Sequence, residues 1–249
     1  MPGKTPPTGV AVAVGTPAER LRTLLVATGS VTLLTSTHRA DLTGRHSVGP
    51  DGQVRIELPT ESGAARQLAC EEDIPAVVDV VDVAPIPMPD RVRGRATLTG
   101  WLTVEGLRGR RPDVVAALHL ATAELVDAGG TTLVDPQAFA SARPDPLASA
   151  EAELVRRLGT DARTLAQLTL LVPASLRQGA GRVHLLRIDR TGVVMRVQAP
   201  APTEGATVTD GPRDVRLAFT RPLHDPDQLG ARLDVLLGRP PRRMSRTRH

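Results

Sequence analysis

The longest regular pattern in the chain runs from Arg91 to Glu105, where apolar or small residues alternate with residues that are mostly polar. The even-numbered set comprises Val92, Gly94, Ala96, Leu98, Gly100, Leu102 and Val104. Because successive side chains of a strand point to opposite faces, this pattern predicts one long strand with a buried even-numbered face. At about 3.3 Å per residue it would reach about 50 Å, so it has to bend, and Gly94 and Gly100 are the predicted bends or bulges. We therefore expect a small, strongly curled sheet or barrel.

Shorter patterns before this strand predict a helix and a β-meander. Thr16 is the expected N-cap of the first helix, and Glu19 completes a capping box with it. A second, short helix over 62–72 is expected to carry Leu68 and Cys70 inward. The predicted strands of the meander are 31–36, 54–58 and 76–84.

The segment after the long strand is predicted to be helical. Residues 111–126 carry Val115, Leu118, Leu120 and Leu125 at helical spacing, and a short strand is expected over 131–134. Prolines and small residues over 141–146 then mark the one convincing domain boundary.

The chain after this boundary shows a different order of helix and strand patterns, which predicts a compact α+β domain. Asp145 is expected to cap a helix that has Pro146 at its first position. A closing helix is expected to have Asp225 as cap, with Gln228 completing a capping box. The other predicted elements are a helix over 161–171 and antiparallel strands over 182–189, 192–198 and 215–220.

Composition narrows the classes of function. Trp101, Phe139 and Phe219 are the only aromatic residues among 249, so we expect an aliphatic core and no ladder of stacked nucleotide bases. Cys70 is the only cysteine, which excludes an intrachain disulfide and a cysteine metal cluster. No apolar stretch is long enough to span a bilayer and no secretory signal is recognisable, so we expect a cytoplasmic protein without a membrane segment.

The basic net charge of +4 comes from the carboxyl terminus. Five arginines lie in the last eleven residues, and without them the rest of the chain has a net charge of −1. Such a tail can contact nucleic acid or acidic lipid, but a solvated tail is the favoured interpretation, so we do not expect nucleic acid as a partner.

No familiar catalytic motif is present, and the six histidines, at 38, 46, 119, 184, 224 and 249, show no metal-ligand spacing. We therefore predict no metal site and leave the catalytic residues unknown. The most distinctive charged feature is the series Arg91, Arg93 and Arg95 on one face of the long strand. We favour an ion-pair ladder with Asp79 and Asp82 over a phosphate or carboxylate site.

The order of elements resembles a known family. A helix, a meander whose long strand carries Gly100-Trp101-Leu102, and a following helical–antiparallel domain resemble the split-barrel proteins of the pyridoxamine-phosphate-oxidase-like superfamily. The branch that is most similar includes haem-utilisation oxygenases and the plastid glutamyl-tRNA-reductase-binding protein. In that branch a domain of unknown function follows the barrel, and residues 187–192 and 215–223 resemble parts of it.

The resemblance, taken together with the patterns above, leads to an expected fold class and domain organisation. The fold class is α+β, with a split β-barrel domain over 16–143 followed by a small helical–antiparallel-sheet domain over 144–238. A disordered leader is expected over 1–15 and a basic disordered tail over 239–249.

The resemblance also implies a homodimer that holds haem or flavin mononucleotide (FMN) at its interface. The candidate cofactor-binding residues are Thr35, Ser36, Arg39, Arg93, Arg95 and His249, the last as a counterpart of the carboxyl-terminal haem ligand of some relatives. Residues 153–158 lack the histidine-containing stretch of many relatives, so both an active oxidoreductase and a member without activity stay open. Three hypotheses remain: a haem- or flavin-binding oxidoreductase, a non-catalytic dimeric scaffold for another protein, and a nucleic-acid binder acting through the tail.

Overall fold

The computed structural model describes residues 8–10, 14–108, 113–178, 180–198 and 211–240. The chain divides into two compact units. The barrel unit consists of residues 13–83 and 92–148, and the second unit contains residues 84–91 together with the segment from 149 onward and the amino-terminal residues up to 12. None of the described helices is long and apolar enough to cross a membrane.

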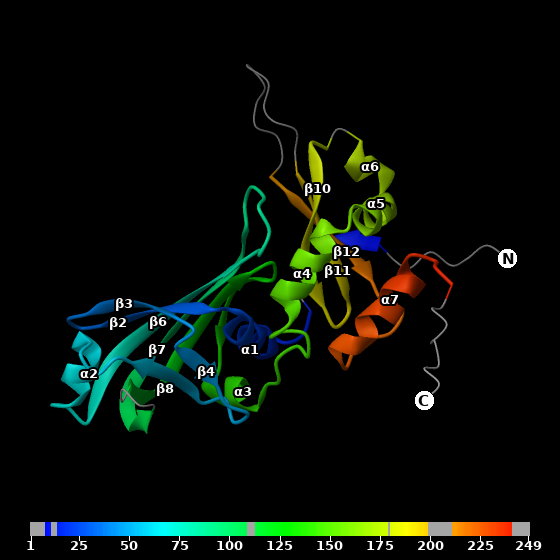
Figure 1. Ribbon diagram of the computed structural model, residues 1–249. Coiled ribbons are helices and arrows are strands. Elements are labelled where there is room, and N and C mark those ends of the chain that lie inside the picture. Colours follow the sequence, from blue (N-terminus) through cyan, green and yellow to red (C-terminus); the bar gives the residue numbers. More distant parts are fainter. Residues whose placement is uncertain (1–7, 11–13, 109–112, 179, 199–210, 241–249) are drawn as a thin grey trace, which may run out of the picture. The chain divides into compact units, whose positions relative to one another are not determined.

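The barrel unit is built on one strongly curled antiparallel sheet, in which β6, β7 and β8 are the long central strands (Figure 1). Its strand order is β3-β2-β6-β7-β8-β5-β4, and β9 also pairs with β8. The strands are β2 (Ser30–Thr35), β3 (Arg39–Thr43), β4 (His46–Val48), β5 (Val54–Leu58), β6 (Asp73–Val83), β7 (Val92–Arg108), β8 (Asp113–Asp127) and β9 (Gly130–Val134). The predicted α+β class with an amino-terminal split barrel is confirmed.

Strand β7 is the long strand that the alternation predicts. The even-numbered positions from Gly94 to Leu102 are buried, as expected, whereas Val92 and Val104 are 41% and 48% exposed. The register of β7 against β8 shifts between Thr99 and Gly100, so the predicted bend at Gly100 is confirmed. A Cβ at Gly100 would lie 2.0 Å from the carbonyl oxygen of His119, which explains why this position needs glycine.

Strand β8 corrects the prediction of a helix over residues 111–126. Residues 113–127 form a strand between β7 and β5, while 109–112 lie outside the described residues. Thr99 pairs with Thr122 and Gly100 with Leu120, which leaves Ala121 as an extra residue in β8. Before this bulge the even positions of β8 face inward, and after it the odd positions do. Because the inward-facing positions switch from even to odd numbers, the apolar residues no longer alternate regularly along the sequence, and their spacing resembles that of a helix.

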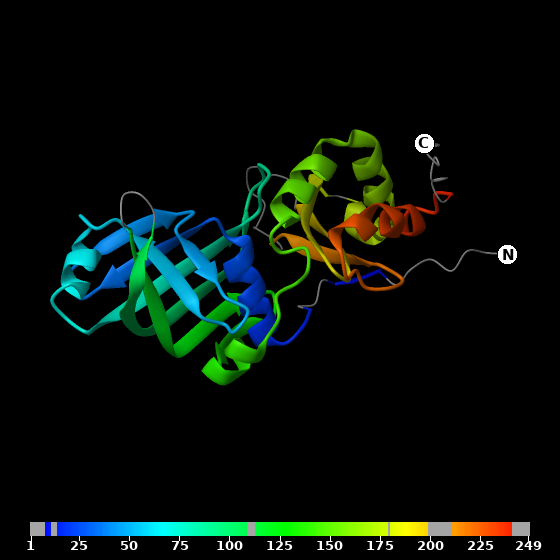
Figure 2. The ribbon, with the colours of Figure 1, turned by 60° about the horizontal axis from the view of Figure 1, so that its bottom comes forward.

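The described residues of the barrel unit form the helices α1 (Pro17–Ala27), α2 (Gly63–Leu68) and α3 (Pro136–Ser141). Helix α1 begins with the predicted capping box of Thr16 and Glu19, and it contacts α3, β4 and β6 (Figure 2). Helix α3 was not predicted. The expectation for Cys70 is wrong, because helix α2 ends before it and its side chain is exposed.

The barrel core is almost entirely aliphatic, as the composition predicts. Phe139 of α3 is the only aromatic side chain in the described core cluster. Burying each large aliphatic side chain contributes about 1.5–3 kcal/mol, so the curled sheet is held mainly by this cluster. Its largest fully buried members are Leu21, Leu25, Leu33, Ile56, Leu58, Ile74, Leu98, Leu102, Leu125 and Phe139.

The second unit contains helices and an antiparallel sheet of order β1-β12-β11-β10. Its sheet comprises β1 (Thr8–Val10), β10 (Arg182–Asp189), β11 (Gly192–Gln198) and β12 (Arg213–Ala218). Its helices are α4 (Glu151–Thr160), α5 (Ala162–Leu171), α6 (Ala174–Arg177), the 3-10 turn η1 (Pro226–Gln228) and α7 (Leu229–Leu236). The predicted helix at 161–171 and the three predicted strands are present; β1 lies within the segment for which no regular structure was expected.

Two predicted helix starts in this part of the chain are wrong in detail. Asp145 caps a turn instead of a helix: its Oδ1 accepts a hydrogen bond from the backbone N–H of Leu147, and α4 starts only at Glu151. Asp225 does cap η1, but the Gln228 side chain accepts from the backbone N–H of His224 instead of completing a capping box.

The connection between β6 and β7 packs in the second unit. Ala84 and Met88 of this connection are buried in a cluster with Leu186 of β10 and Val194 of β11. A side chain of β11, Arg196, also donates to the backbone carbonyl of Asp90. The hairpin of the barrel therefore supplies part of the core of the second unit.

Candidate functional site

The exposed side of the β6–β7–β8 sheet, which we call the outer face, carries the most distinctive side chains of the barrel unit. Trp101 of β7 lies opposite Pro75 of β6 and His119 of β8 in the strand register. Directly opposed residues of antiparallel strands point to the same face, with Cβ atoms about 4.5–5.5 Å apart. Trp101 is 47% exposed and His119 is also exposed. An indole and an imidazole therefore stand side by side on an open surface.

The two bulges in the strand pair β7–β8 fix this pairing. Gly100 and Leu120 are opposed on the buried side, so Trp101 and His119 have to face outward. Thr103, two residues beyond Trp101 and therefore on the same face, contacts the histidine: its Oγ1 lies 2.9 Å from Nε2 of His119. The imidazole is thus held in one orientation by a neighbouring strand.

Sequence reasoning missed His119 because it placed the residue on a helix. The pairing of β7 with β8 is the feature from which His119 could have been recognised. If residues 113–127 are aligned as an antiparallel partner of the long strand, with one extra residue at the bulge, His119 falls opposite the single tryptophan.

The arginine series on β7 splits into residues with different roles. Arg93 is the extra residue of a bulge, since Asp82 pairs with Gly94 and Val83 pairs with Val92. Its guanidinium donates to Oδ1 of Asp82 from Nη2 at 2.6 Å and from Nε at 3.0 Å, and both side chains are more than nine-tenths buried.

The flanking arginines do not extend this ion pair into a ladder among the described contacts. Arg91 donates to the backbone carbonyl of Ala84 from Nε and Nη2, at 3.2 and 3.0 Å. Arg95 is exposed. Asp79 accepts from the hydroxyl of Thr97 at 2.7 Å.

The hydroxyl residues predicted for a phosphate lie at the β2–β3 hairpin. The Thr35 hydroxyl accepts from the backbone N–H of His38 at 3.2 Å, and the Ser36 hydroxyl accepts from the side chain of Gln67 at 3.3 Å. Arg39, the first residue of β3, is exposed. Both hydroxyls are therefore engaged in holding the hairpin and tying it to α2.

The described candidate residues do not converge on one place. Thr35 pairs with Ala76, which pairs with Gly100, whereas Arg95 and Arg93 lie five and seven residues away along β7. At about 3.3 Å per residue these arginines are roughly 17–23 Å from the Thr35 position. His249 lies outside the described residues.

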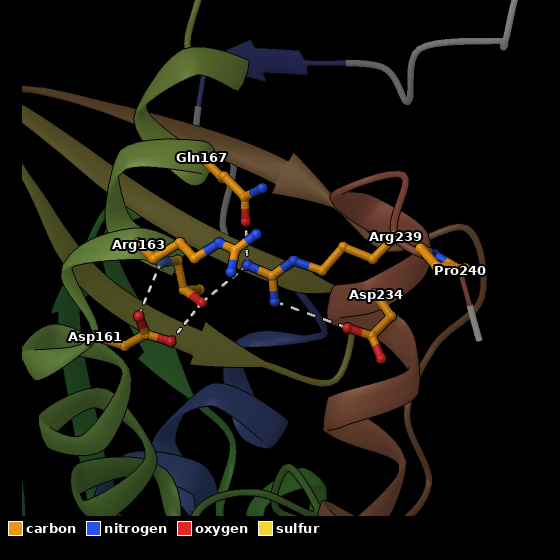
Figure 3. A pocket seen from close by; sticks show the side chains of 7 residues that line it. Asp161, Arg163, Gln167, Asp234, Arg239 and Pro240 are labelled. Carbon is orange, nitrogen blue, oxygen red and sulfur yellow. Dashed lines mark hydrogen bonds and ion pairs between the residues drawn. The ribbon is translucent and has the colours of Figure 1, made fainter. Parts of the chain in front are cut away.

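A separate hollow of about 440 Å³ lies in the second unit beside α5 and α7 (Figure 3). Arg239 enters it, donates to the Thr164 hydroxyl at 3.1 Å and to the Gln167 side chain, and lies 3.8 Å from a carboxylate oxygen of Asp234. Asp161 caps α5, and its hydrogen bonds from the Thr164 hydroxyl and backbone lower the pKa of its carboxyl group. Arg239 thus occupies hydrogen-bond acceptors that line the hollow, and its contacts connect α5 with α7.

The described residues contain no group of three histidine, cysteine, aspartate or glutamate side chains that could hold a metal ion. A haem requires only one or two axial ligands, because the porphyrin holds the iron. Of the two cofactors that the sequence resemblance implies, haem fits the outer face better, because this face offers an exposed imidazole beside an exposed aromatic ring. An FMN phosphate needs several converging donors, and the described candidates for that role are dispersed or already bonded.

Comparisons with known proteins identify the fold. No family model and no curated protein matches the sequence. A haem-binding protein from Mycobacterium smegmatis is similar in structure, with a TM-score of 0.55 and 22% sequence identity over 91% of this chain and 98% of that chain.

Two further solved structures are more remote. An FAD- and haem-binding protein from Mycobacterium smegmatis has a TM-score of 0.31 and 18% identity, with coverage of 81% and 91% of the two chains. An NADH:FAD oxidoreductase from Streptomyces globisporus has a TM-score of 0.26 and 11% identity, covering 50% of this chain and 98% of its own. The first similarity establishes a shared split-barrel fold; the other two are too distant to add to it.

Proposed function

We propose that this protein binds haem on the outer face of the barrel sheet and that two copies pair along this face. The observation that carries the proposal is the exposed pair of Trp101 and His119, held directly opposite each other on β7 and β8. The structural similarity to a haem-binding protein over nearly the full length of both chains supports the choice of ligand.

The chemistry of the face suits a flat, largely apolar ligand that contains iron. Trp101 offers a large amphipathic ring, and Pro75 beside it and the half-buried Val77 on the same strand extend the apolar surface. Haem, when bound, supplies one-electron and oxygen chemistry, for which the polypeptide provides a ligand and a surrounding surface. The residues of this chain would then bind and orient the group.

Pairing of two copies would cover four exposed valines that lie around Arg95 at one end of the outer face. Val81 and Val83 of β6, Val92 of β7 and Val126 of β8 gather at one end of the outer face, each 40–41% exposed. Stable interfaces bury about 800 Å² on each partner, and long strands with apolar edges can supply such an area. A non-catalytic scaffold that docks another protein would use the same face.

The ligand is tested by titrating the purified full-length protein with hemin and, separately, with FMN, while absorbance and thermal unfolding are followed. Saturable binding of hemin with a shifted Soret band and a raised melting temperature is expected, because a ligand of the folded state stabilises it. Trp101→Ala should weaken hemin binding, whereas Leu170→Ala, an exposed leucine of the second unit, should not. Absence of saturable hemin binding refutes haem as the ligand.

The pairing is tested by sedimentation equilibrium. Val83→Glu places a charge opposite Val92 in this group of valines and should shift the protein toward the monomer, whereas Leu170→Glu should leave the association unchanged. A wild-type protein that is monomeric with and without hemin would contradict the proposed pairing.

A further inference from the structure

Building on the haem proposal, we infer that His119 is the axial ligand of the haem iron. This assignment differs from the sequence-based candidate, His249, and makes the barrel strand β8 the source of the ligand. The inference rests on where the described histidines lie and on what each ring nitrogen contacts.

Two histidines of the barrel unit other than His119 are poorly suited to this role. His46 has Nε2 3.0 Å from the backbone carbonyl of Leu25, and its Nδ1 is buried, so neither nitrogen is open to a ligand. His38 is exposed, but it lies at the tip of the β2–β3 hairpin with Nδ1 2.7 Å from the Thr37 hydroxyl. No large exposed apolar side chain occurs at this hairpin among the described residues.

The described histidines of the second unit have no comparable setting. His184 has a buried Nε2 without a hydrogen-bond partner, and burial, with help from Arg182, lowers the pKa of its imidazole. His224 is exposed in the connection between β12 and η1. Neither has an exposed aromatic ring opposite it in a strand pair.

His119 combines three features that an axial ligand needs. Its ring is exposed on a rigid strand, it stands beside the exposed indole of Trp101, and one ring nitrogen is already held by Thr103. Histidines that bind metals usually have the other ring nitrogen hydrogen-bonded, which fixes the tautomer and orientation. The Thr103 hydroxyl, 2.9 Å from Nε2, restrains the ring, and no second protein contact of this imidazole occurs among the described residues.

The test uses the full-length protein reconstituted with hemin and compares absorption spectra in the ferric, ferrous and carbon monoxide forms. His119→Ala should lose the spectrum of histidine-ligated haem and bind hemin roughly 10- to 100-fold more weakly. Added imidazole should restore the wild-type spectrum, since it replaces the missing ligand. His38→Ala, an exposed histidine of the same unit, is the matched control and should behave as wild type, as should His249→Ala.

The possible outcomes separate this inference from the proposed function. A wild-type protein that binds hemin while His119→Ala keeps the same spectrum overturns the ligand assignment and leaves haem binding intact. Loss of the spectrum in His249→Ala, or a His119→Ala protein that imidazole does not restore, also overturns the assignment. If the wild-type protein shows no saturable binding of hemin, both proposals fail.

Discussion

Replacing Asp82 with asparagine should destabilise the barrel unit strongly, because it removes the carboxylate that faces the buried guanidinium of Arg93. The two side chains are 8% and 5% exposed, and their closest atoms are 2.6 Å apart. Asparagine keeps the volume of the side chain, so the change tests the charge of the pair and not its packing.

The expected magnitude follows from this burial. Removing one partner of a buried ion pair costs about 3–5 kcal/mol, since the other charge stays in a poorly solvated place, whereas an exposed pair is worth about 0–1 kcal/mol. We therefore expect a loss of about 3 kcal/mol in the free energy of unfolding, or roughly 10 °C in the melting temperature of a domain of this size. The double change Asp82→Leu with Arg93→Met should restore most of this loss, because replacing a buried pair by apolar side chains is often nearly neutral.

Urea unfolding followed by circular dichroism measures these differences. Arg108→Gln is the matched control, because Arg108 forms an ion pair with Glu57 on the same unit but its side chain is 72% exposed. An Asp82→Asn protein as stable as this control would refute the structural account of Arg93. The alternative anion site would then regain support, and inorganic phosphate should raise the melting temperature of the wild type.

Two further predictions concern Gly100 of β7, which lies opposite the bulge in β8, and the acid stability of the second unit. Gly100→Ala should lower the free energy of unfolding by at least about 2 kcal/mol and weaken hemin binding, because the new Cβ would lie 2.0 Å from the carbonyl oxygen of His119. Gly106→Ala is the control, because a Cβ at this position of the same strand meets nothing within 4 Å. Equal melting temperatures of the two variants would contradict this reasoning. Burial opposes ionisation of Asp189, but hydrogen bonds and the charge of Arg216 prevail and lower the pKa of its carboxyl group. The ionised Asp189 should therefore contribute fully to stability above the unfolded-state pKa of about 3.9, and this contribution should be lost as the pH falls through the lower folded-state pKa. When the free energy of unfolding is measured against pH, an Asp189→Asn protein should lose less stability at acid pH than the wild type.

Local patterns allowed much of the fold to be predicted. The alternation around Leu98 identified the long strand, and the capping box of Thr16 identified the start of α1, because each depends on residues that are close in sequence. The bend at Gly100 could also be predicted, since glycine in the interior of a strand has few other uses.

The errors arise where distant residues decide the structure. The strand β8 was missed because the extra residue at Ala121 is defined only by its pairing with β7, and the role of His119 was missed with it. The pairing of Arg93 with Asp82 was anticipated, but the separation of the arginines from Thr35 required the register of the whole sheet.

The packing of the β6–β7 connection has a consequence for how the chain folds. A ribosome completes the tip of this hairpin, with Ala84 and Met88, well before it makes the β10 and β11 strands that cover those side chains. A nascent barrel therefore presents a small apolar tip to its surroundings until β10 and β11 have been made, and a chain truncated after residue 148 would keep this tip exposed permanently. The second unit cannot be separated in the same way, because residues 84–91 of the hairpin and the amino-terminal residues up to 12 belong to it as well as the segment from 149 onward.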